Sequence, residues 1–123
     1  MPREPDPVTL AEVARRAAEV VDPADEDGDI ADLMTLFEDA DEPISAVLPA
    51  LEERVAELTG RIDPQEELPA VQMMGAVIVY LGHRRDEVSD VEADILRLAA
   101  RAEYAGDPPP LIEEWLTDQG VTL

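Results

Sequence analysis

The sequence predicts an all-α fold, a single compact bundle of five or six short helices around a buried apolar central helix. Apolar residues recur at steps of three and four through most of the chain, which is the period of a helix with one buried face. Residues 68–82 carry no charge, and a helix that is apolar all round lies inside a protein. The rival interpretation is a strand at 76–81, but no other segment offers that strand a partner for its backbone groups.

The 123 residues, of which 46% are hydrophobic, are sufficient for one core, so we expect a single helical domain over 9–123. Residues 1–8 contain three prolines and are expected to form a flexible tail. No internal repeat is evident. No apolar run reaches the ~20 residues of a membrane span, and the N-terminus lacks the apolar stretch of a secretory signal. We therefore expect a cytoplasmic protein without membrane association.

Capping signals define the first two helices. Thr9 begins a capping box before an apolar face that predicts a helix at about 10–21. The acidic segment 22–28 contains proline and glycine and is expected to be a loop. Asp29 is expected to cap a second helix that ends near Ala40.

The apolar residues of 44–62 recur at spacings of 4, 3, 4, 3 and 4, which is typical of helices packed at shallow angles. Pro49 interrupts this pattern, because proline inside a helix costs roughly 3 kcal/mol. We expect a kink at Pro49, or a short turn at 44–48 followed by a helix from the proline. Thr59 and Gly60 are expected to end that helix.

The second half of the chain predicts three more elements. Pro69 indicates a restart after a first helix signal, so the central helix is expected at about 70–82. Ser89 is expected to cap a helix whose apolar residues repeat over 88–102. Three prolines then precede a short final helix at 111–116.

The net charge is −21, from nine basic residues, all arginine, and thirty acidic ones. Direct binding of nucleic acid is excluded, because phosphate contacts need clustered basic side chains, and anionic membrane surfaces are disfavoured for the same reason. Arginine in place of lysine, together with small apolar residues, indicates a high-GC host. The acidity is also typical of adaptation to high salt, where charge keeps a protein soluble.

Residues 17–53 hold thirteen acidic residues and no basic one. Either this segment is a solvated surface, or it binds a basic protein partner, and we expect the second. The expected partner-binding residues are Asp22, Asp25, Glu26, Asp27, Asp29, Asp32, Glu38, Asp39, Asp41 and Glu42. A related alternative is mimicry of DNA, in which rows of carboxylates inhibit a nucleic-acid-binding enzyme. A homo-oligomer through the repeating apolar faces at 44–62 or 88–102 is the other partner considered.

A second class of function is binding of a small ligand or divalent ion by the acidic segment 22–42. Asp25, Asp27 and Asp29 alternate as in the middle of a calcium-binding loop, where acids supply oxygen ligands. The outer ligand positions of such a loop are occupied here by Pro23 and Met34, neither of which provides a carboxylate. The sequence therefore predicts at most weak Ca²⁺ binding and no other cofactor.

Catalytic residue types are scarce, so we expect no enzymatic activity. The chain has no cysteine, and its one histidine, His83, lies at the expected end of the central helix. The two serines, Ser45 and Ser89, are placed where turns or caps need them. The only tryptophan, Trp115, is expected to pack in the core, with a role as a partner anchor as the alternative.

Overall fold

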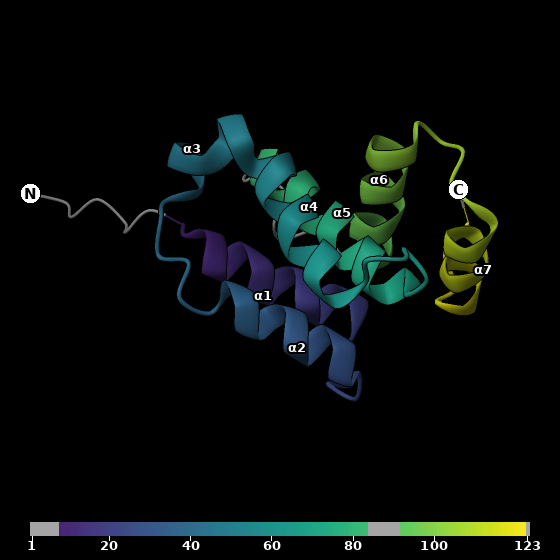
Figure 1. Cartoon of the computed structure of the whole chain (residues 1–123). Helices are drawn as coiled ribbons and strands as arrows, with labels where there is room; N and C mark the ends of the chain where they lie inside the picture. Colours follow the sequence, from purple (N-terminus) through teal and green to yellow (C-terminus); the bar gives the residue numbers. More distant parts are fainter. Residues whose placement is uncertain (1–7, 84–91, 123) are drawn as a thin grey trace, which may run out of the picture.

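The computed structural model describes residues 8–83 and 92–122, which form a bundle of helices (Figure 1). The elements are α1 (Leu10–Val21), α2 (Gly28–Phe37), α3 (Ile44–Val47), the 3₁₀ turn η1 (Leu48–Ala50), α4 (Leu51–Ile62), α5 (Pro69–His83), α6 (Glu92–Tyr104) and α7 (Pro110–Asp118). No strand occurs in this part of the chain, which confirms the all-α prediction. Of the predicted flexible tail at 1–8, all but Val8 lies outside the described residues.

Helix α5 is the centre of the bundle, and it contacts α1, α2, α4, α6 and α7 (Figure 1). Its buried residues are Val71, Met73, Met74, Gly75, Ala76, Val77, Ile78, Tyr80, Leu81 and Gly82. The prediction of a central apolar helix is confirmed, and the alternative strand at 76–81 is wrong. In the described part of the chain, no helix has the length and apolar character needed to cross a membrane.

The first two helices follow the predicted pattern with a shift in one cap. Thr9 caps α1, whose bounds are those expected. The N-cap of α2 is Asp27 and not Asp29, because Asp27 has an extended backbone and its carboxylate accepts hydrogen bonds from the first helical turn. Helix α2 ends at Phe37, three residues short of the predicted end at Ala40.

Of the two interpretations of 44–62, the short turn before a helix is the closer one, although α4 begins at Leu51 and not at Pro49. Pro49 lies in the 3₁₀ turn, where its missing N–H group breaks no α-helical hydrogen bond. Helix α4 then runs through Thr59 and Gly60 to Ile62, so the predicted stop was too early. The repeating apolar side chains of 44–62 are buried or half-buried within the single chain. They pack into the core of the single chain, with Leu48 and Ile62 only partly covered.

The last two helices are close to the predicted positions. Helix α6 covers most of the predicted helix at 88–102, whose start, with Ser89, lies outside the described residues. Gly106 follows α6 with a φ of +83°, a conformation that glycine adopts without steric cost. Helix α7 confirms the predicted short helix at 111–116 and extends it at both ends.

The loops after α1 and α4 share one geometry. Each begins with Asp-Pro, and the Asp22 and Asp63 carboxylates accept hydrogen bonds from the backbone N–H groups four and five residues later. The third residue after each aspartate has a positive φ, 54° at Asp25 and 55° at Glu66. The helix before each loop has 12 residues, and the next helix starts at the same distance from the aspartate. The chain therefore contains two equivalent helix–loop–helix units, α1–α2 and α4–α5.

These two units overturn the expectation that the chain has no internal repeat. The equivalent core positions hold different apolar residues, such as Ala17 and Leu58 or Leu33 and Met74. Beyond the Asp-Pro pair, little side-chain identity is retained, so the sequence shows only a common apolar period. The repeat becomes visible through its backbone hydrogen bonds.

Replacing Gly60 by alanine is expected to raise the free energy of unfolding by about 0.5 to 1 kcal/mol. Glycine is less favourable than alanine inside a helix, and a Cβ at Gly60 would meet no atom within 4 Å. The contrast is Gly75→Ala, since a Cβ there would lie 3.1 Å from Thr59 Cγ2 and 3.2 Å from Val55 Cγ1. Urea unfolding of both variants checks this. Equal stabilisation by both would contradict the close approach of α4 and α5 at Gly75.

Candidate functional site

The ten predicted partner-binding acids lie on the α1–α2 loop, on α2 and on the segment that follows α2. Helix α2 lies beside α1 at the edge of the bundle (Figure 1). Eight of the acids are exposed, namely Asp25, Glu26, Asp29, Asp32, Glu38, Asp39, Asp41 and Glu42. The other two, Asp22 and Asp27, are half-buried. The buried face of α2, formed by Ile30, Leu33 and Phe37, turns its acids outward.

The carboxylates of the two half-buried aspartates accept hydrogen bonds from the backbone of the loop and of the first turn of α2. Asp22 accepts hydrogen bonds from the backbone N–H groups of Glu26, at 3.1 Å, and Asp27, at 3.0 Å. Asp27 Oδ1 accepts from the N–H groups of Asp29, at 2.9 Å, and Ile30, at 3.3 Å. Both carboxylates satisfy amides that a helix end would otherwise leave unpaired. They position the exposed acids around them.

Glu42 is the one member of the set that takes part in an ion pair between described residues, with Arg54 at 3.2 Å. The pKa of Glu42 is lowered by the hydrogen bond from its own backbone N–H and then by the hydrogen bond and charge of Arg54. The other ion pairs in the described ranges join Arg16 to Glu19, Arg61 to Glu57 and Arg97 to Asp94. Seven exposed carboxylates of the set therefore have no arginine partner in this part of the chain.

The predicted weak calcium ligands do not form a metal cluster in the structure. Within residues 8–83 and 92–122, no group of three or more His, Asp or Glu side chains is arranged to hold a metal ion. Asp27 uses its carboxylate on backbone amides, while Asp25 and Asp29 are exposed on either side of it. Alternation along the sequence does not bring these three carboxylates to a common point.

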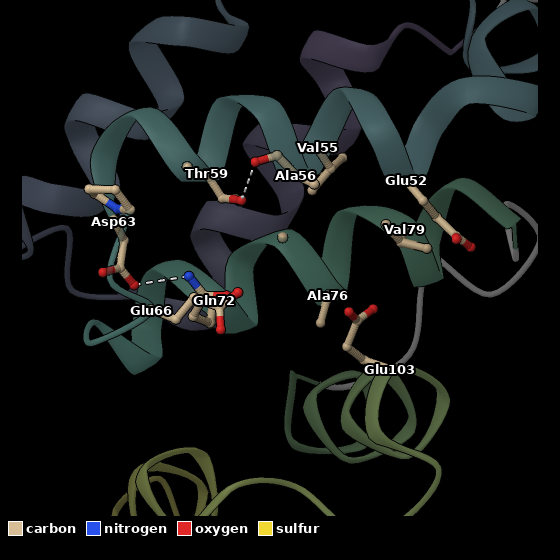
Figure 2. A pocket seen from close by; sticks show the side chains of 13 residues that line it. Glu52, Val55, Ala56, Thr59, Asp63, Glu66, Gln72, Ala76, Val79 and Glu103 are labelled. Carbon is tan, nitrogen blue, oxygen red and sulfur yellow. Dashed lines mark hydrogen bonds between the residues drawn. The ribbon is translucent and has the colours of Figure 1, made fainter.

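A cavity of about 230 Å³ lies between α4 and α5, with one wall from α6. Figure 2 shows Thr59 and Gln72 inside it, Glu52 at one end, and Glu103 reaching toward it from α6. Asp63 closes the other end and accepts a hydrogen bond from Gln72 Nε2 at 2.9 Å (Figure 2). Every buried side-chain nitrogen and oxygen in the described residues has a hydrogen-bond partner, so no buried side-chain polar atom in the lining of this cavity is left unpaired.

Burial and the nearby charge of Glu52 raise the pKa of Glu103. Burial, followed by the charges of Glu103 and Glu66, raises the pKa of Tyr104 to about 12. The carboxylates around the α4–α5 cavity therefore come close enough to repel one another. Sequence reasoning missed this cavity, and the signal that pointed to it was Gln72, the polar exception in the uncharged run 68–82.

Trp115 lies where the core meets the acidic loop. Its side chain is half-buried and packs against the core, as expected. It also lines a shallow depression of about 540 Å³ together with Glu26, Asp27 and Ala70. The two interpretations of this residue are therefore compatible, since one part of the ring is packed while another borders the acidic surface.

The remaining polar candidates from the sequence lie apart. His83 is exposed at the end of α5, and Ser45 is exposed in α3. Ser89 lies outside the described residues. A scan against protein-family models and searches of curated proteins and of solved structures returned no match to this chain.

Proposed function

We propose that this chain is a cytoplasmic, non-enzymatic interaction protein that binds a basic protein partner through the exposed carboxylates of residues 22–42. The observation that supports this proposal is the set of seven exposed acids on and around α2 without an arginine partner in the described chain. Three of the four ion pairs in the described ranges join arginines to acids outside this set, so the seven exposed acids give this surface an excess of negative charge. Such a surface attracts a basic partner over roughly 8 Å at physiological salt.

Adaptation to high salt is the competing explanation of the same charge. It differs in its consequence, because repulsion among surface acids is relieved by salt and stability then rises between low and high salt. Binding of a basic partner is weakened by salt. Mimicry of DNA is a special case of the proposal, in which the basic partner is an enzyme that ordinarily holds phosphates. Competition between this chain and duplex DNA for such an enzyme distinguishes that case.

Neutralising acids within the segment is expected to weaken binding of a basic probe more than neutralising the same number elsewhere. The test variant carries Asp32→Asn, Glu38→Gln, Asp39→Asn and Asp41→Asn, all at exposed positions. The control variant carries Glu67→Gln, Asp107→Asn, Glu114→Gln and Asp118→Asn, also exposed. With labelled oligolysine at about 0.15 M salt, we expect about a tenfold loss of affinity for the test variant and about twofold for the control.

The two variants have the same net charge, so they separate location from total charge. Equal losses of oligolysine binding would show that the probe senses only the overall charge and would contradict the proposed surface. Failure of the unmodified chain to bind oligolysine at all would overturn the proposal. Far-ultraviolet circular dichroism of both variants confirms that the helices are retained.

A further inference from the structure

A groove of about 360 Å³ runs along α1 and α2 at the edge of the acidic segment. Its apolar lining comes from Ala18, Ile30, Ala31 and Met34, of which Ile30 is buried beneath the others. Its rim is charged and is formed by Arg15, Glu19, Asp22 and Asp25. The groove therefore combines an apolar floor with a rim that carries three acids and one base.

This groove is the counterpart of the α4–α5 cavity in the other helix–loop–helix unit. Their equivalent positions are Ala18 and Thr59, Glu19 and Gly60, Asp22 and Asp63, Asp25 and Glu66, and Ala31 and Gln72. Helix α6 supplies one wall of the α4–α5 cavity through Glu103, as Figure 2 shows. The described residues that line the α1–α2 groove belong only to α1, α2 and the loop between them. Among the described residues, a third helix therefore lines the α4–α5 cavity and none lines the α1–α2 groove.

The chemistry of the α1–α2 groove selects its occupant. The floor is apolar where the second unit has Thr59 and Gln72, so it favours an aliphatic side chain over a polar one. The excess of acids on the rim, continued by the exposed Glu26 and Asp29, favours cationic neighbours of that side chain. A second copy of this chain, with a net charge of −21, would be repelled.

We propose that the α1–α2 groove docks a basic amphipathic helix of the partner, with an aliphatic side chain on Ala31 and Met34 and with lysine or arginine side chains toward Asp25 and its neighbour Glu26. This is the helix-in-groove mode of recognition, in which apolar residues at helical spacing anchor the complex. It rests on the proposed function, and it adds an apolar anchor to what is otherwise attraction between charges.

Two probes separate the two ideas. One is an amphipathic helical peptide made only of leucine and lysine, and the other is oligolysine of the same charge. Ala31→Trp fills the α1–α2 groove. Ala56→Trp adds the same bulk to the lining of the α4–α5 cavity and serves as the control, since Ala31 and Ala56 are both exposed. We expect Ala31→Trp to weaken binding of the leucine–lysine peptide about tenfold, while its oligolysine binding and both affinities of Ala56→Trp change less than about twofold.

Met34→Ala gives an independent check, because it shortens an apolar side chain of the floor without adding bulk or charge. We expect Met34→Ala to weaken binding of the leucine–lysine peptide about threefold and to leave the affinity for oligolysine unchanged. The groove proposal is overturned if the leucine–lysine peptide binds both the unmodified chain and Ala31→Trp equally, or if Ala56→Trp has the larger effect. That result leaves the proposed function intact as long as oligolysine binds. If the unmodified chain does not bind oligolysine, that result contradicts the proposed function instead.

Discussion

Replacing Asp63 by alanine is expected to lower the free energy of unfolding by about 3 kcal/mol. Asp63 is 4% exposed, and its carboxylate accepts three hydrogen bonds, from the N–H groups of Glu67 at 2.8 Å and Leu68 at 2.9 Å and from Gln72 Nε2 at 2.9 Å. Removing the acceptor leaves donors unpaired in a partly buried site, which costs about 1 to 3 kcal/mol for each fully buried group. Urea unfolding measures the loss.

Asp22→Ala is the matched control. Its carboxylate occupies the equivalent position and accepts the two equivalent backbone bonds, but it is half-buried and has no counterpart of Gln72, since Ala31 stands there. We expect a loss of about 1 kcal/mol, typical of a lost capping interaction. Losses of the same size for Asp22→Ala and Asp63→Ala would show that the third hydrogen bond and the deeper burial contribute nothing.

The same carboxylate makes stability depend on pH. Burial acts to raise the pKa of Asp63, but hydrogen bonds from Glu67, Leu68 and Gln72 outweigh it and hold the pKa below its ordinary value of 3.8. Because the folded state then binds a proton less readily than the unfolded state, the contribution of Asp63 is fully present above pH 3.8. It is lost as the pH falls from there through the folded pKa. Asp63→Asn is expected to flatten this part of the stability profile.

Replacing Phe37 by alanine is expected to lower the free energy of unfolding by about 4 kcal/mol. Phe37 is 0% exposed and is the only phenylalanine in the chain. It belongs to the buried face through which α2 packs on α1, α4 and α5. Truncation of a buried aromatic residue removes its packing and leaves a cavity, at a cost of about 3 to 5 kcal/mol. Thermal and urea unfolding measure the effect.

Leu36→Ala tests whether the stability loss depends on which face of α2 carries the apolar side chain. Leu36 is the neighbour of Phe37 on the same helix but is only half-buried. We expect it to cost about 1 kcal/mol, in proportion to the smaller apolar area that it buries. If Leu36→Ala cost as much as Phe37→Ala, α2 would be packed through a different face and its acids would not be turned outward as described.

Most of the fold could be predicted from the sequence because helices depend on local patterns. The period of the apolar residues and the cap at Thr9 predicted α1 to the residue, and the charge-free run predicted the central helix. The errors lie at helix ends. Asp27 and Asp29 are both acceptable caps by residue type, and only the path of the loop selects Asp27. Gly60 was expected to stop α4, yet it is tolerated inside the helix at a modest cost.

Less of the candidate site could be predicted. The sequence identified the acidic segment, but it treated its ten carboxylates as equals. In the structure, Asp22 and Asp27 hold backbone amides, Glu42 pairs with Arg54, and seven acids stay exposed without a described arginine partner. Hydrogen bonds to a neighbouring turn and pairing with a distant helix decide these roles. Neither the hydrogen bonds nor the ion pair can be predicted from the amino-acid composition.

The sequence by itself determined the all-α class, the central position of α5 and the surplus of negative charge, because each follows from the side chains and their spacing along a few turns. Only the tertiary structure decided which carboxylates remain available, that α1–α2 and α4–α5 are equivalent units, and that Glu103 reaches the cavity beside one unit while the other keeps an open groove. The physical reason is that these features depend on contacts between helices far apart in the chain, and a periodic pattern fixes the buried face of a helix without fixing its neighbours.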